Sequence, residues 1–271
     1  MMSEDTGPEP QGRYLHGHAE PVLRSHRWRT ADNSAAYLMP HLAEGQEILD
    51  VGCGPATITM DLGRRFPGST IMGIDPSAEV LAGVTDLPGN VTLTQGDIFH
   101  QTFPDDRFDV VHAHQVLQHL GDPVGALRQM RRVCRPGGIV AVRDADYGAM
   151  TWAPSSPQLT QWQQTYRAAA RAGGHDPDAG RHLLGWVQSA DFTDITATAG
   201  VWCFSTVADR AWWAGLWADR VSAPESRLHQ TLRRDGMDDD ALQDMARAWH
   251  EWALAPDGWF AVLHGQIIAR A

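Results

Sequence analysis

The sequence predicts an α/β fold in which a Rossmann-like, seven-stranded and mostly parallel sheet ends in an antiparallel last strand. Short apolar segments alternate with segments of helical spacing over residues 46–146. This alternation is typical of parallel sheets with right-handed crossovers. A glycine-containing turn follows the first apolar segment, and an aspartate ends the second. Folds of this kind bind ligands beyond the carboxyl ends of their strands.

The first strand is expected at 47–51 and leads into a glycine turn. Gly52 and Gly54 allow backbone angles that a side chain would forbid, and they let a ligand approach the main chain. A helix is expected at 57–66. Its first N–H groups would face the turn, where they favour negative charge or hydroxyl groups. A single G-x-G is common between strands and helices, so its meaning depends on the segments that follow.

The second strand gives the turn its context. This strand, expected at 70–74, ends in Asp75, about twenty residues beyond the turn, where a Rossmann-like unit carries the acid that binds ribose hydroxyls. The remaining strands of the parallel part are expected at 91–94, 108–112 and 139–142, with an amphipathic helix at 123–134 before the last of them.

The segments outside this core differ in composition. Residues 1–12 are acidic and rich in proline and glycine, which predicts a disordered tail. Residues 13–45 predict an N-terminal helical cap, with helices at 19–28 and 31–42. The second of these helices carries apolar residues at helical spacing.

The part of the chain after Tyr147 is rich in tryptophan. Ten of the eleven tryptophans lie from Trp152 onward. A helical insertion is expected at about 150–180. Strands follow at 192–205 and 259–269, and because a short hairpin would join them, residues 207–258 are interpreted as a helical insertion between the last two strands.

Five motifs stand out together: Asp50-Val51-Gly52-Cys53-Gly54-Pro55, Gly73-Ile74-Asp75, Gly96-Asp97, Phe108-Asp109-Val110-Val111 and Arg135-Pro136-Gly137-Gly138. This set resembles the class I S-adenosylmethionine-dependent methyltransferases, and most resembles the group typified by ubiquinone and menaquinone biosynthesis methyltransferases. The resemblance implies a methyltransferase domain over residues 46–271. It also implies S-adenosyl-L-methionine as cofactor, with S-adenosyl-L-homocysteine as product. Ala56 stands where the family usually has a third glycine, and we expect it to tighten the packing of helix against turn.

The resemblance assigns most of the cofactor to the glycine turn and the second strand. Gly52 and Gly54, with Cys53 between them, are expected to lie against the amino-acid part. Asp75 is expected to accept hydrogen bonds from both ribose hydroxyls, because an ionised carboxylate is acceptor-only. Pro76 is expected to touch the adenine face. The alternative for Asp75 is a helix N-cap.

Further cofactor contacts are implied at the third and fourth strands and in the cap. Asp97 is expected to accept from the adenine amino group, and the backbone of Ile98 to donate to a ring nitrogen; the alternative for Asp97 is a turn residue. Tyr14 and Arg29 are expected to face the cofactor, with Arg29 pairing with the methionine carboxylate; the alternative is a surface or packing role. His114 is expected to form a wall of the site.

The acceptor is expected near the ends of the fourth and fifth strands. His119 is the candidate general base, since an imidazole titrates near neutral pH. The alternative is a histidine that packs a helix. The candidate substrate-binding residues are His18, Gln115, Asp146, Tyr147 and Trp152.

Composition excludes several classes of function. The net charge of −11 argues against nucleic-acid binding. All 22 basic residues are arginine, which excludes Schiff-base chemistry and a lysine base. The three cysteines are widely spaced, and His112 and His114 alone do not predict a metal site.

No apolar run approaches the roughly 20 residues of a membrane span, and the N-terminus does not resemble a signal peptide. A cytoplasmic location without membrane contact is therefore expected.

The sequence is thus interpreted as a methyltransferase that transfers a methyl group to carbon, nitrogen or oxygen of a small, partly apolar molecule. A role in secondary-metabolite or quinone-like biosynthesis fits such an acceptor. One alternative is a nicotinamide-dependent oxidoreductase, against which Asp50, Ala56 and Asp97 argue. The other is a non-catalytic module that binds the cofactor.

Overall fold

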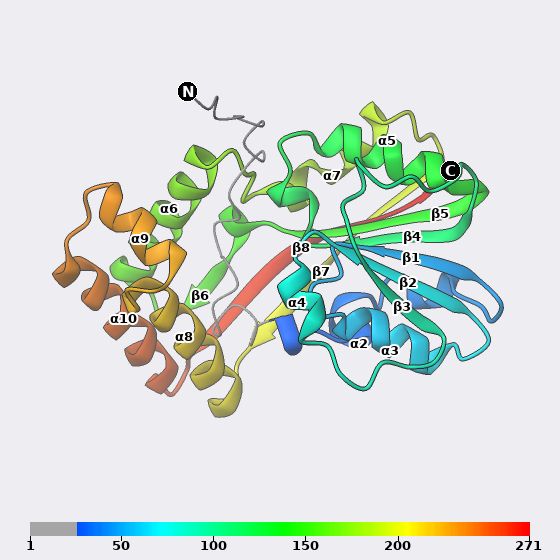
Figure 1. Cartoon of the computed structure of the whole chain (residues 1–271). Coiled ribbons are helices and arrows are strands. Elements are labelled where there is room, and N and C mark those ends of the chain that lie inside the picture. The colour runs from blue at the N-terminus through cyan, green and yellow to red at the C-terminus, as the bar shows by residue number, and fades with distance from the viewer. Residues whose placement is uncertain (1–25) are drawn as a thin grey trace, which may run out of the picture.

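A computed structural model describes residues 26–271, and its centre is one twisted eight-stranded sheet (Figure 1). The strand order is β3-β2-β1-β4-β5-β8-β6, and β7 pairs with β8 as well. The strands are β1 (Glu47–Val51), β2 (Thr70–Asp75), β3 (Val91–Gln95), β4 (Phe108–His114), β5 (Cys134–Ala145), β6 (Thr151–Ala153), β7 (Ile195–Phe204) and β8 (Trp259–Arg270).

The first five strands are parallel, and the last strand is antiparallel as predicted. β8 pairs with β5 from Ile139↔Arg270 to Ala145↔His264, and with β7 along ten residue pairs. Its first residues pair with the short strand β6, which the sequence did not predict. The Rossmann-like fold class is confirmed, with one strand more than the seven expected.

Helices cover both faces of the parallel part of the sheet (Figure 1). On one face lie α5 (Pro123–Val133) and α7 (Ala179–Ser189), and on the other α2 (Ala31–Ser34), α3 (Thr57–Arg65) and α4 (Ala78–Ala82). α5 begins at the N-cap Asp122 and buries Leu127 and Met130 completely. Each such side chain stabilises the fold by roughly 1.5–3 kcal/mol.

The remaining helices form a second hydrophobic core beyond β6. They are α6 (Pro157–Ala172), α8 (Val207–Ser222), α9 (Arg227–Arg234) and α10 (Asp239–Leu254), of which the last three lie between β7 and β8 (Figure 1). Trp162, Trp217 and Trp249 are fully buried between these helices, with ring centroids 4.5–6.2 Å apart. The aromatic residues therefore hold these helices against the beginning of β8, near Phe260. The sequence did not predict α9.

Two local predictions are wrong. The helix expected at 31–42 is broken into α2 and a 3-10 turn, η1 (Met39–His41). The chain leaves the helical path at Ala35, ahead of Pro40, and both Ala35 and Leu38 are buried in the core beside α3. β5 begins at Cys134, ahead of the expected 139–142, and runs through the Arg-Pro-Gly-Gly segment. The end of the chain stabilises this extension, since the Gly137 amide donates to the Ala271 carbonyl and the Ala271 amide to the Gly138 carbonyl.

The predictions for the tail at 1–12, for most of the helix at 19–28, and for Tyr14 and His18 lie outside the described residues. Within 26–271, no helix is both long and apolar enough to cross a bilayer.

Candidate active site

The glycine turn joins β1 to α3 in an unusual backbone conformation. Gly52, Gly54 and Ala56 have φ values of +66°, +54° and +57°. A Cβ atom at Gly52 would lie 2.5 Å from a methyl group of Val116, so both the backbone angle and the packing require glycine there. Ala56 adopts the left-handed conformation at a cost of roughly 1–2 kcal/mol, and it is fully buried at the start of α3.

Asp75, at the end of β2, is hydrogen-bonded to this turn. Its Oδ2 atom accepts from the Gly54 amide at 2.9 Å, and its Oδ1 atom accepts from the Ser77 amide at 2.9 Å. Ser77, and not Asp75, is the N-cap of α4, because the Ser77 hydroxyl accepts from the Val80 amide. The helix-cap alternative for Asp75 is therefore wrong. Backbone amides therefore orient both oxygens of this half-buried carboxylate.

The ends of β2 and β3 place the other predicted adenine contacts nearby. Pro76 is exposed beside Asp75, and Ile98 is buried. Asp97 Oδ1 accepts from the Phe99 and His100 amides, and the His100 ring lies 2.9 Å away. This geometry favours the turn interpretation of Asp97 over a direct hydrogen bond to adenine.

Two side chains of the turn region, those of Asp50 and Cys53, are packed against neighbouring residues of the fold. Asp50 accepts from Thr59 at 2.6 Å and from His112 at 2.8 Å, in a buried group that fixes α3 to β1 and β4. The Cys53 sulfur packs against Gly73 of β2. Burial, followed by the negative charges of Asp50 and Asp75, raises the pKa of this thiol. Cys53 therefore offers the site its backbone and not a thiolate.

A pocket lies beyond the carboxyl ends of β4 and β5. It is lined by residues just before α2, by the segment after β4, by the end of β5 and the segment after it, by α8, and by one residue each of β7 and β8. The lining residues are His26, Trp28, Arg29, Gln115, Gln118, His119, Ala145, Tyr147, Met150, Trp202, Trp212, Trp213, Arg220 and Val262.

Arg29 and Gln115 meet on the side of this pocket near β4. Arg29 Nη2 donates to Gln115 Oε1 at 2.7 Å, and the Gln115 amide group lies 2.9 Å from His264 Nε2. Gln115 has a φ of +55°, and its backbone N–H donates to the Arg143 carbonyl at 2.7 Å. The strained backbone turns the Gln115 side chain toward the pocket, next to Val116 and the glycine turn.

His119 lines the same pocket but is a poor base. Burial, followed by the charges of His175 and Arg29, lowers its pKa to about 3. Its ring contacts Gln118 at 3.0 Å and packs edge-on against His175. A general base works best with a pKa near the working pH, so this environment favours the packing alternative.

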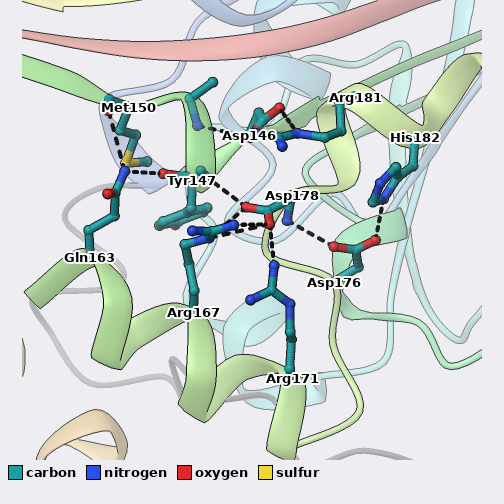
Figure 2. A network of polar contacts seen from close by, with 12 residues as sticks. Asp146, Tyr147, Met150, Gln163, Arg167, Arg171, Asp176, Asp178, Arg181 and His182 are labelled. Atoms are coloured by element: carbon teal, nitrogen blue, oxygen red, sulfur yellow. Dashed lines mark hydrogen bonds and ion pairs between the residues drawn. The ribbon is translucent and has the colours of Figure 1, made fainter.

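The segment after β5 is held in place by ion pairs (Figure 2). Arg181 donates to both oxygens of Asp146 at 2.6 Å. Asp178 accepts from the Gly148 amide at 2.7 Å and from Arg167 at 2.6 Å, and it also contacts Arg171. Asp146 is therefore directed at Arg181 and is not part of the pocket lining, so the geometry favours loop positioning over the predicted substrate contact.

Tyr147 is directed into the pocket by this arrangement. Its backbone N–H donates to the Pro177 carbonyl, and Gln163 donates to its carbonyl at 2.6 Å (Figure 2). The ring stacks on Tyr166 with centroids 4.4 Å apart. Burial raises the pKa of the Tyr147 hydroxyl.

Two other predicted residues lie beside the pocket and do not line it. His114 is buried between Arg143 and His264, and burial holds its pKa well below the ordinary value. Trp152 stacks on Phe260, with nearly parallel rings 5.6 Å apart.

The sequence interpretation missed Arg220 as a site residue. Trp213, Trp217 and Arg220 follow the i, i+4, i+7 spacing of one helix face. That spacing could have indicated that Arg220 lies on the buried side of its helix.

The strand-end residues fit S-adenosylmethionine. The turn has no side chain at Gly52 or Gly54, the Asp75 carboxylate is oriented by two amides, and Arg29 supplies a cation in the pocket. Hydroxyl, amine and carboxylate groups of a nucleoside–amino-acid ligand match these donors and acceptors.

Comparison with known proteins agrees with this fit. A methyltransferase domain model matches residues 42–200. The chain is similar to an uncharacterized methyltransferase of Schizosaccharomyces pombe, with 32% identity over 97% of this chain and 98% of that protein. In fold it is similar to a putative methyltransferase from an antibiotic biosynthesis pathway of Anabaena variabilis, with a TM-score of 0.61, 14% identity, and coverage of 88% and 98%.

A solved structure with bound product shares the fold as well. Phosphoethanolamine N-methyltransferase 2 of Haemonchus contortus, in complex with S-adenosylhomocysteine, matches with a TM-score of 0.55 and 18% identity over 87% of this chain and 52% of that one.

Proposed function

This chain belongs to the class I S-adenosylmethionine-dependent methyltransferases, and we propose that it methylates a small, partly apolar molecule held in the pocket beyond β4 and β5. The observation that carries the proposal is the composition of that pocket. Its walls include the rings of Trp28, Tyr147, Trp202, Trp212 and Trp213, beside the glycine turn. Binding sites for small organic molecules are typically apolar and aromatic with a few placed polar groups.

We propose that the cofactor lies along the strand ends. Gly52 and Gly54 would take the amino-acid part, Asp75 the ribose, and Pro76 with Ile98 the adenine. Asp97 would support this end through the turn that it caps. The cofactor supplies an activated methyl group on its sulfonium.

We propose that the protein contributes chiefly alignment and exclusion of water. The acceptor atom must lie in line with the carbon–sulfur bond, and holding it there supplies most of the catalysis that such a reaction needs. Among the polar side chains that line the pocket, Gln115 and Tyr147 would help to orient the acceptor. His119, neutral near pH 7 because of its lowered pKa, would act as a wall or hydrogen-bonding group.

A role in secondary-metabolite or quinone-like biosynthesis remains part of this proposal, because aromatic acceptors of that kind match the ring-lined walls. The test is transfer of a labelled methyl group from S-adenosylmethionine to small molecules in a protein-free cell extract. We expect labelled product of low molecular mass. Tight binding of S-adenosylhomocysteine with no transfer to any extract fraction would favour the non-catalytic alternative.

A further inference from the structure

A buried histidine outside the pocket lining is connected to the pocket through Gln115. His264 lies on β8 and is fully buried. Its ring packs against Trp202, with centroids 4.3 Å apart, and stacks on His114 at 6.2 Å. Its Nε2 atom lies 2.9 Å from the Nε2 atom of Gln115, which lines the pocket. Packing therefore fixes the imidazole at a position where it contacts a side chain of the site.

Hydrogen bonds run in one direction along this contact. At one end Arg29, which can only donate, lies 2.7 Å from Gln115 Oε1. The Gln115 amide nitrogen must then donate to His264, so Nε2 of the imidazole accepts. At the other end, Nδ1 of the imidazole lies 3.1 Å from the Val262 carbonyl, which can only accept. His264 is thus a neutral imidazole with its hydrogen on Nδ1, since a hydrogen on Nε2 would place two donors against each other.

The surroundings of His264 maintain this state. Burial, followed by the charge of Arg143, holds the pKa of His264 well below its ordinary value. The Gln115 backbone is held as well, because its N–H donates to the Arg143 carbonyl at 2.7 Å. Both partners of the contact are therefore fixed before a ligand binds.

This arrangement leaves one donor of Gln115 for a bound molecule. A side-chain amide has two N–H donors, of which His264 accepts one. Within residues 26–271 the second has no protein partner. The next residue, Val116, lies beside Gly52 of the glycine turn. Turning the amide over would direct its NH₂ group at Arg29, which is also a donor, so the second N–H has a fixed orientation.

From this geometry we propose that His264 is a positioning residue for methyl transfer, and that Gln115, oriented by it, donates its second amide hydrogen to an oxygen or nitrogen atom of the acceptor. The cavity of about 30 Å³ has room for a water-sized group, and the contact requires only one polar atom there. This inference rests on the proposed function, because the acceptor is the molecule that receives the methyl group. His264 acts through Gln115 and does not itself touch the ligand.

The protonation state of His264 is tested first, by long-range ¹H–¹⁵N NMR spectra of the full chain, with His264→Gln to assign the signal. We expect a neutral ring with its hydrogen on Nδ1 from about pH 6 to pH 8. Gln115→Glu should raise the pKa of His264, because a carboxylate cannot donate to Nε2 but accepts from a protonated ring. A wild-type ring that is protonated, or that carries its hydrogen on Nε2, overturns the inference. So does an unchanged pKa in Gln115→Glu.

The role in the reaction is tested by transfer of a labelled methyl group to the small molecules of a protein-free cell extract. His264→Phe removes the Nε2 acceptor and should lower the rate about 10-fold or more, while calorimetry finds the affinity for S-adenosylhomocysteine changed less than about threefold. His264→Gln places an amide oxygen near the position of Nε2 and should restore most of the rate. The control is His229→Phe on α9, where the ring Nδ1 likewise lies 3.0 Å from a carbonyl, that of Val221.

The outcomes separate this inference from the proposed function. A folded His264→Phe variant with the wild-type rate overturns it, and so does equal loss of rate in His264→Phe and His264→Gln. Loss of S-adenosylhomocysteine affinity in step with the rate also overturns it, because Gln115 would then serve the cofactor. If His264→Phe fails to fold, the wild-type tautomer and the pKa in Gln115→Glu still decide. The expected tautomer without any transfer by the wild type would instead refute the proposed function.

Discussion

Removing the Asp75 carboxylate tests the cofactor site most directly. Each of its oxygens accepts one backbone hydrogen bond, from Gly54 and from Ser77, at 2.9 Å. The carboxylate is therefore oriented before any ligand binds, and an ionised carboxylate can accept from several donors at once, ribose hydroxyls included. A hydrogen bond to a charged group contributes about 1.5–3 kcal/mol. Asp75→Ala should weaken binding of S-adenosylhomocysteine by roughly 10- to 150-fold.

Asp75→Asn refines this prediction. An amide keeps one acceptor oxygen, but its NH₂ group must then face the N–H of Gly54 or Ser77, which is also a donor. We therefore expect Asp75→Asn to lose nearly as much affinity as Asp75→Ala. Calorimetry with S-adenosylhomocysteine measures both, and melting curves confirm that the variants are folded.

Asp105→Ala is the matched control. Asp105 is an exposed carboxylate paired with Arg132 at 2.6 Å, just before β4 at the opposite edge of the sheet. Its removal should leave the dissociation constant unchanged. If Asp75→Ala also leaves the constant unchanged in a folded protein, the assignment of Asp75 to ribose is refuted.

Three further predictions concern the acceptor side. Asp178→Asn should loosen the Tyr147 segment and raise the KM for the acceptor several-fold, while calorimetry finds the affinity for S-adenosylhomocysteine unchanged; equal loss of both would contradict a local role. His119→Gln should lower the single-turnover rate less than about tenfold, and a loss of 100-fold or more would restore it as the base. Burial raises the pKa of Asp144 to about 8. The native state therefore holds a proton that the unfolded chain releases near pH 4, and stability is lost as pH rises toward 8. Asp144→Asn should melt at increasingly higher temperature than the wild type across that range, and a pH-independent difference would argue against this titration.

The parallel strands could be predicted because their signal is local. A strand buried on both faces reads as a short apolar run, and β1, β2 and β4 each begin at the residue expected from the sequence. The glycine turn could also be predicted from the sequence, since the backbone angles at Gly52 and Gly54 favour glycine.

Failures occurred where distant contacts decide the structure. The apolar spacing of 31–42 suits a helix, yet α2 ends at Ser34, and Ala35 and Leu38 pack into the core that also contains Leu62 of α3. β5 extends back to Cys134, which pairs with Phe108 of β4, and the end of the chain, more than 130 residues later, supplies hydrogen-bond partners at Gly137 and Gly138. Neither fact is visible in a local pattern.

The contrast between local signals and distant contacts also explains which site residues could be predicted. Asp146 and Tyr147 are neighbours in sequence, and nothing in that sequence indicates which one faces the pocket. The choice is made by Arg181, which takes the Asp146 carboxylate, and by Pro177 and Gln163, which hold the backbone of Tyr147. These partners lie 16–35 residues away along the chain.

The site thus has two halves with different physical origins. The cofactor half is built by short strand–turn–helix connections, whose geometry depends on a few glycines and on Asp75. The acceptor half is built by α8 and the segment after β5, whose positions depend on packing in the aromatic core and on the ion pairs of Asp146 and Asp178. Since α8 lies in the acceptor half, we expect substitutions on it to change binding of the acceptor more than binding of the cofactor.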